Sequence, residues 1–86
     1  MNQKPQLRKV NKKMKVILTN EFTQLNETDC VIYNFSQNPI EIATTNVKNS
    51  GLILLSGQRQ RINTEENLYA RSIPVGESAQ INIVNI

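Results

Sequence analysis

The sequence of 86 residues contains no histidine, no tryptophan and a single cysteine, Cys30. Without histidine there is no His-based catalytic pair or triad, and without a second cysteine no internal disulfide can form. A structural zinc site needs a cluster of cysteine and histidine ligands, so none is expected. The three glycines, Gly51, Gly57 and Gly76, are isolated, which excludes a glycine-rich phosphate-binding loop. These absences predict a protein that is not an enzyme and has no cofactor or metal, with Cys30 as a small core residue.

Long apolar runs are also missing. No segment approaches the roughly 18 apolar residues of a membrane span. The apolar residues 16–18, which follow the basic start of the chain, are too few for the ~7–15-residue apolar region of a signal peptide. We therefore expect neither a membrane partner nor export, and the lone cysteine fits a reducing compartment.

Acidic residues are absent from the beginning of the chain, where six basic residues lie: Lys4, Arg8, Lys9, Lys12, Lys13 and Lys15. The rest of the chain holds four basic against seven acidic residues. This asymmetry predicts an extended basic arm, residues 1–13, before a mildly acidic domain, residues 14–86. We expect the arm to dock onto an acidic protein surface; a solvated tail and a contact with nucleic acid are the alternatives. Because the arm has no aromatic residue for stacking on bases, no specific nucleic-acid partner is expected.

The rest of the chain consists mostly of short apolar runs, with one polar strand-like run over residues 58–62. Turn residues such as Asn, Ser, Gly and Pro bound these runs, which is typical of β-strands. No apolar pattern with a helical period spans three turns. We predict an all-β fold, a small antiparallel β-sandwich of jelly-roll-like type, in which residues 22–25 continue the first strand after a kink. The expected strands cover residues 14–20, 30–35, 40–44, 52–55, 58–62, 68–72 and 78–84.

Alternation along these strands selects the side chains that should form the core. In residues 30–35, Val31, Tyr33 and Phe35 share one face, and we expect that face to point inward. The complete predicted core is Val31, Tyr33, Phe35, Ile40, Ile42, Leu52, Leu54, Leu68, Ile81 and Ile83.

Three arginines, Arg59, Arg61 and Arg71, are expected to flank one region of a sheet. The spacing of Arg59 and Arg61 places both on the same face of a strand. Charges on an edge strand prevent unwanted pairing, and this is the interpretation we favour. The alternative is a surface contact for an acidic partner.

The small size of the chain limits its core. A domain of this length buries only about 60% of its unfolded surface and usually needs a disulfide, a metal or a partner for stability. Since the first two are not expected, we predict a homo-oligomer or docking onto a larger protein.

Several short motifs follow one another over residues 30–84 in an order known from another group of small β-domains. They are Val31-Ile32-Tyr33-Asn34, Pro39-Ile40-Glu41-Ile42, Gly51-Leu52-Ile53-Leu54, Ser56-Gly57-Gln58, Leu68-Tyr69-Ala70, and Gly76-Glu77-Ser78-Ala79 before a strand over residues 80–84. This order resembles small β-domain virion structural proteins of tailed bacteriophages, of the head-decoration, head-fibre or tail-associated type. The resemblance implies a non-enzymatic virion protein, assembled in the host cytoplasm. It would dock through its arm onto the major capsid protein or another virion protein.

Two other functions stay open at this point. One is a binding module of a fibre that recognises a sugar or a host surface through its loops. The other is a small nucleic-acid-binding β-barrel, whose binding would depend steeply on salt.

Overall fold

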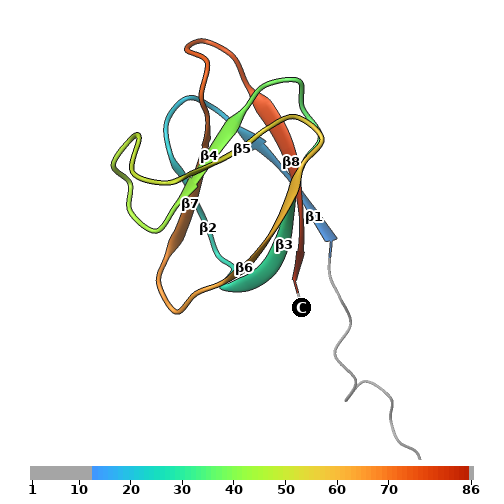
Figure 1. Cartoon of the computed structure of the whole chain (residues 1–86), viewed down its shortest axis with the longest axis vertical. Helices are drawn as coiled ribbons and strands as arrows, with labels where there is room; N and C mark the ends of the chain where they lie inside the picture. The colour runs from blue at the N-terminus through green and yellow to red at the C-terminus, as the bar shows by residue number, and fades with distance from the viewer. Residues whose placement is uncertain (1–12, 86) are drawn as a thin grey trace, which may run out of the picture.

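The computed structural model describes residues 13–85, which form eight strands in two four-stranded sheets. Figure 1 shows the two sheets facing each other around a shared interior. Most of the predicted arm, including Lys4, Arg8, Lys9 and Lys12, lies outside the described residues. The strands are β1 (Lys13–Leu18), β2 (Thr23–Leu25), β3 (Asp29–Asn34), β4 (Ile40–Ala43), β5 (Leu52–Leu54), β6 (Arg59–Asn63), β7 (Leu68–Ser72) and β8 (Ala79–Asn85).

Sheet A has the strand order β1-β8-β3-β6, and sheet B has the order β2-β7-β4-β5. Every pair of neighbouring strands is antiparallel. The predicted all-β antiparallel sandwich is therefore confirmed. Between residues 13 and 85 the chain forms no helix that is long and apolar enough to cross a membrane.

The first predicted strand proves to be two strands in different sheets. β1 pairs with β8 in sheet A, whereas β2 pairs with β7 in sheet B. Residues 19–22 carry the chain from one sheet to the other, and hydrogen bonds to the end of β7 hold them there. The Asn20 side-chain amide donates to the carbonyl oxygens of Ser72 and Ile73 at 2.9 Å each, and the Ser72 amide donates to the Thr19 carbonyl at 2.8 Å. A simple kink would have kept both segments in one sheet.

The interior contains aliphatic side chains from both sheets. The predicted core positions Ile40, Ile42, Leu54, Leu68, Ile81 and Ile83 are all buried. Cys30 is fully buried as well, which confirms its assignment as a core residue. Burial, together with the nearby carboxylates of Glu27 and Asp29, raises the pKa of the Cys30 thiol to about 11.

The prediction of which face of β3 points into the core was wrong. Its inward side chains are Cys30, Ile32 and Asn34, whereas Val31 and Tyr33 face outward and Phe35, just beyond the strand, is 60% exposed. Both faces of β3 are largely apolar, so alternation alone does not select the inner one. The pairing register between β3 and β6 decides which face of β3 points inward. Arg61 lies opposite Val31 and Arg59 opposite Tyr33, and these arginines must stay in water.

β5 is the outermost strand of sheet B and pairs only with β4. Its Leu52, predicted to be in the core, is 46% exposed, and the neighbouring Ile53 and Leu55 are exposed too. Alternation predicts two faces but cannot reveal that an edge strand lacks a neighbour to cover it. Leu54 is the one residue of β5 that is buried.

One buried polar residue joins the two sheets. The Asn34 side-chain amide donates to the carbonyl oxygens of Asn38 and Leu54, at 2.9 and 3.1 Å. Its Oδ1 accepts from the Ser36 amide and hydroxyl, at 3.0 and 2.7 Å. Because Asn34 ends β3 of sheet A and Leu54 lies on β5 of sheet B, these bonds connect the sheets through the turn between β3 and β4.

Candidate functional site

The outer face of sheet A gathers basic side chains at its two edges and mainly apolar and aromatic side chains between them. Two cross-strand rows define it. The first runs from Lys13 through Val84 and Val31 to Arg61, and the second from Lys15 through Asn82 and Tyr33 to Arg59. We call these eight residues, together with Phe35, the basic face.

Charge is strongly segregated onto this face. Residues 13–85 contain six basic and seven acidic residues, and four of the basic ones belong to the basic face. On the strands of sheet A the only acidic residue is Asp29, which forms an ion pair with Arg61 at 2.7 Å. Within the described residues, the other three cations of the face, Lys13, Lys15 and Arg59, form no ion pair. The basic face therefore carries a net positive charge on a domain whose described residues sum to a negative one.

Two aromatic rings lie between the basic edges. The rings of Tyr33 and Phe35 are stacked, with their centroids 5.9 Å apart and their planes only 5° from parallel. The Phe35 amide donates to the Gln80 carbonyl at 3.2 Å, which holds the main chain of Phe35 against β8. A hollow of about 270 Å³, lined by Lys13, Tyr33, Phe35 and Val84, runs beside the rings. The face thus offers an aromatic surface with cations within reach.

Asn82 lies in the middle of the second row, between Lys15 and Tyr33. The residue is 9% exposed, and its Oδ1 accepts no hydrogen bond from the described residues. A buried acceptor without a donor is unfavourable by about 1–3 kcal/mol. A donor from outside the domain would relieve that deficit.

Of the predicted site residues, Lys13, Lys15, Arg59 and Arg61 come together on the basic face. Arg71 does not, and the prediction of a surface contact there is wrong. It is 5% exposed and lies on the outer side of sheet B, where its Nε donates to Glu41 Oε1 at 2.8 Å. The partner strand β4 and the loop over residues 44–51 cover it, which the sequence around Arg71 does not reveal.

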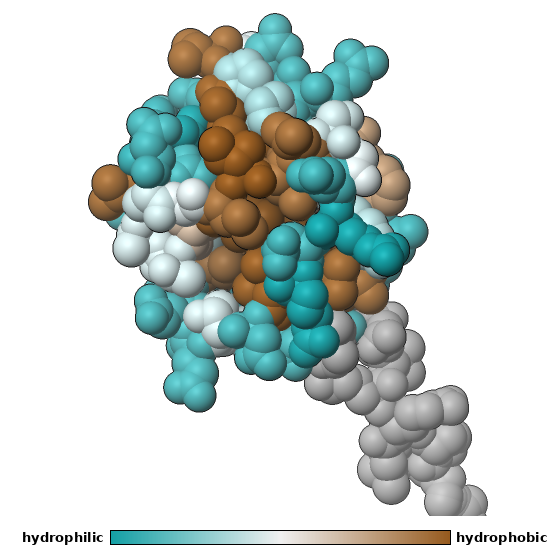
Figure 2. Space-filling view, in the orientation of Figure 1, coloured by the Kyte–Doolittle hydropathy of each residue, from teal (hydrophilic) through white to brown (hydrophobic). Residues whose placement is uncertain are grey.

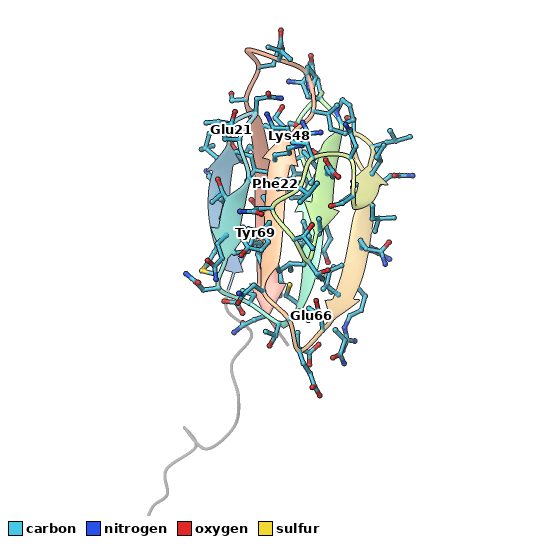
Figure 3. All side chains as sticks on the ribbon, turned by 90° about the vertical axis from the view of Figure 1, so that its left-hand side faces the viewer. Glu21, Phe22, Lys48, Glu66 and Tyr69 are labelled. Carbon is cyan, nitrogen blue, oxygen red and sulfur yellow. The ribbon has the colours of Figure 1, made fainter. Side chains whose placement is uncertain are left out.

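Aromatic side chains also surround Arg71. Its guanidinium carbon lies 5.6 Å from the centre of the Phe22 ring, and Phe22 meets Tyr69 edge to face with centroids 6.3 Å apart. Figure 3 shows Phe22 and Tyr69 on this side of the domain, with Glu21 and Lys48 close to them. Lys48 pairs with Glu21 at 3.2 Å, so the basic residues on this side are committed to acidic partners.

Sequence reasoning missed the contributions of Tyr33, Phe35 and Asn82. Tyr33 and Phe35 were assigned to the core, and Asn82 was not considered. The available signal was the pair of arginines two residues apart in β6. In a strand paired with β6, the residues directly opposite these arginines lie on the same face of the sheet as they do, and that face must be exposed to water. Using that signal would have required knowing that β3 and β6 are neighbours.

A pocket lies elsewhere, in the opening between the two sheets. It measures about 430 Å³ and is lined mainly by aliphatic side chains of Ile42, Leu52, Ile62 and Leu68, with the hydroxyls of Thr44 and Ser50. Figure 2 shows apolar side chains gathered along the middle of the domain, with polar side chains on both sides. This pocket contains no ionisable group.

No protein-family profile and no curated protein matches the sequence. Among solved structures, the chain is similar to a cupin-2 domain-containing protein from Shewanella frigidimarina, with a TM-score of 0.61 and 17% sequence identity. The similarity covers 87% of this chain and 69% of the other. At this level of identity it shows the fold alone, and it confirms the jelly-roll-like type of the sandwich.

This similarity corrects the resemblance inferred from the sequence motifs. The matching structure is a bacterial cupin-2 domain protein, so the identification with virion proteins of tailed bacteriophages is wrong, and the function as a virion structural protein falls with it. The motifs mark the turns and strands of a jelly roll, which unrelated proteins share.

Cupin folds occur in enzymes and in proteins without catalytic activity, and some hold a metal ion. The residues of this chain do not fit a metal. The sequence has no histidine, and the one thiol is buried with a raised pKa. Within residues 13–85 no three Cys, Asp or Glu side chains come together in a way that could hold an ion. The pocket between the sheets offers only aliphatic groups and hydroxyls.

Proposed function

We propose that this protein is a non-catalytic binding module that holds an anionic polymer on the basic face. The observation that carries the proposal is the placement of four cations on the two edge strands of one sheet face. Neighbouring strands are about 4.8 Å apart, so β1 and β6, three spacings apart in sheet A, set the two charged edges of the face about 14 Å from each other. A linear polyanion can contact both edges at once, whereas a small anion would contact one.

The ionisable groups elsewhere support a role without catalysis. Glu41 and Arg71 are buried and bound to each other, so neither is available to a substrate. The Cys30 thiol is buried and its raised pKa keeps it protonated near neutral pH, which removes it as a nucleophile. The basic face instead offers recognition through charge and a preformed surface.

Neutralising two cations of the basic face tests this proposal. We expect the double variant Lys15→Gln/Arg59→Gln to bind a labelled heparin oligosaccharide and a labelled oligothymidylate about tenfold more weakly than the unaltered chain. For the oligothymidylate, the slope of log affinity against log salt should fall by about 1.4, because two phosphate contacts are lost. Fluorescence anisotropy titrations of the full chain at several salt concentrations measure both quantities.

Lys48→Gln is the matched control. It removes a cation that is also exposed but lies on the opposite side of the domain, where Lys48 pairs with Glu21, and it should leave affinity and salt slope unchanged. The basic residues before Lys13 stay in every variant. If the double variant binds as tightly as the unaltered chain, the basic face does not hold the polymer and the proposal is wrong.

A further inference from the structure

We infer that the anionic polymer is a single-stranded nucleic acid whose bases stack on the Tyr33–Phe35 pair while its phosphates lie on the basic edges. This inference rests on the proposed function and adds the class of ligand. Cations alone accept any polyanion. The aromatic pair between them is the feature that selects for bases.

The geometry of the rings suits stacking. Parallel rings already form the first layers of a stack, and Phe35, which is 60% exposed, presents aromatic surface to which a base can add. The hydrogen bond from the Phe35 amide to the Gln80 carbonyl holds the main chain in place before any ligand arrives. A base therefore meets a preformed surface, and little ordering is needed on binding.

The positions of the cations suit a backbone that passes the rings. Tyr33 lies directly opposite Arg59 on the neighbouring strand, so a base stacked on the pair has a guanidinium close by for its phosphate. On the other side, Asn82 separates Tyr33 from Lys15. The polymer can thus keep its phosphates on both edges while its bases lie over the centre.

Asn82 adds a polar group at the same place. Its unpaired Oδ1 lies between Lys15 and Tyr33, and a base offers amino and imino N–H donors along its edge. The residue is 9% exposed but its Oδ1 is buried, so a donor reaches this oxygen only after the flanking side chains move. A sulfated polysaccharide or a peptide of aspartate and glutamate would use the cations, but neither carries an aromatic base to stack on the rings.

The contrast with duplex DNA follows from the same geometry. In a duplex the bases are paired and stacked on one another, so only the phosphates can reach this face. Stacking on aromatic side chains is open to unpaired bases and tolerates any sequence. We therefore expect a preference for single strands over a duplex of the same length, without strong sequence selectivity.

Replacing the exposed ring tests the inference. Phe35→Leu keeps an apolar side chain at an exposed position but removes the aromatic face, and should weaken binding of a labelled oligothymidylate about tenfold. Binding of the labelled heparin oligosaccharide should stay within twofold, since the charges are intact. Phe35→Tyr, which keeps the ring, should restore oligothymidylate affinity. Anisotropy titrations with both probes and with a duplex of equal length give these values, and circular dichroism checks that the variants are folded.

The outcomes separate this inference from the proposed function. If Lys15→Gln/Arg59→Gln weakens binding of both polymers and Phe35→Leu weakens neither, the face binds polyanions without reading bases, and only the inference is wrong. Equal affinity for single strands and duplex would also contradict it. If the charge variant has no effect on either polymer, the proposed function itself fails.

Discussion

Glu41→Gln is expected to lower the free energy of unfolding by about 3–5 kcal/mol, because it leaves the buried guanidinium of Arg71 without its counter-charge. Glu41 is 2% exposed and accepts three hydrogen bonds. Its Oε1 accepts from Arg71 Nε at 2.8 Å and from the Asn49 amide at 3.0 Å, and its Oε2 accepts from the Gly51 amide at 2.8 Å. A glutamine amide has an acceptor oxygen in place of only one of the two carboxylate oxygens. Its NH₂ group would take the place of the other oxygen and face a donor there.

Urea denaturation followed by circular dichroism measures this loss. Glu21→Gln is the control, because it makes the same chemical change in the exposed ion pair with Lys48, where the cost should stay within about 1 kcal/mol. A similar loss in both variants would mean that burial does not strengthen the dependence of Arg71 on Glu41. The double variant Glu41→Gln/Arg71→Met should lose less than the sum of its single changes, since no buried charge remains unpaired.

The effect of Glu41→Gln should depend on pH. Burial opposes ionisation of Glu41, but the hydrogen bonds from the Asn49 and Gly51 amides and from Arg71 outweigh it and hold the pKa of this carboxyl below its ordinary value of 4.5. A lowered pKa in the folded state adds stability that is complete above pH 4.5 and is lost as the pH falls through the folded-state pKa. The stability gap between the unaltered protein and the variant should therefore be widest near neutral pH and narrow in acid.

The Glu41 carboxylate also positions the loop between β4 and β5. Through the amides of Asn49 and Gly51 it holds residues 44–51 over sheet B, and Asn49 Oδ1 lies 3.4 Å from Arg71 Nη2. A Cβ on Gly51 would collide with the Ile42 carbonyl oxygen and lie 2.7 Å from Ala43 Cβ, so the loop can approach the sheet this closely only with glycine. The loop thus covers part of the outer side of sheet B, whereas among residues 13–85 the four cations on the outer side of sheet A stay exposed.

Most of the strands were predictable because they are short runs, mainly apolar, with clear stops. β7 was predicted at residues 68–72 and observed there, with Asn67 before it and Pro74 shortly after it. Which face of β3 points into the core was not predictable from its own residues, since apolar side chains occupy both of its faces. The pairing with β6 determines the inward face of β3. This pairing joins residues far apart in the sequence, so a local pattern does not contain it.

The candidate site was predictable in its charges and not in its shape. Arg59 and Arg61 were expected on one face, and both are exposed on β6. Their position beside Tyr33 depends on the register between β3 and β6, which no local pattern contains. Arg71, in contrast, was expected on the surface and is buried. Its neighbours in sequence suggest an exposed strand residue, but the Glu41 carboxylate across from it on β4 converts it into a buried ion pair.

Asn34→Ala is expected to lower the free energy of unfolding by about 3 kcal/mol, because several buried polar groups lose their partners at once. Asn34 is 1% exposed, and its side chain makes four hydrogen bonds to Ser36, Asn38 and Leu54. The Leu54 carbonyl oxygen is left without this donor inside the sandwich. The bond across the sheets is lost with it, so β5 should become the first strand to exchange its amide hydrogens.

Asn67→Ala, an exposed loop asparagine, provides the control and should change stability by no more than about 0.5 kcal/mol. Urea denaturation gives the free energies, and hydrogen exchange followed by NMR reports on β5. If Asn34→Ala unfolds at the same urea concentration as Asn67→Ala, water must replace the lost bonds at no cost, and the connection between the sheets is unimportant.

Asn34→Asp separates hydrogen bonding from shape, because it keeps the size of the side chain. One carboxylate oxygen would replace the amide nitrogen and face the carbonyl oxygens of Asn38 and Leu54, so the charged form is disfavoured and the pKa of the new carboxyl should rise. An acid whose pKa is raised on folding destabilises the protein more as the pH increases above its unfolded value. The stability deficit of Asn34→Asp should therefore grow toward neutral pH. The deficit of Glu41→Gln also grows in that direction, but there the altered residue has lost its charge, whereas here it gains one. A pH-independent deficit for Asn34→Asp would show that this carboxyl reaches water and that the turn between β3 and β4 is open.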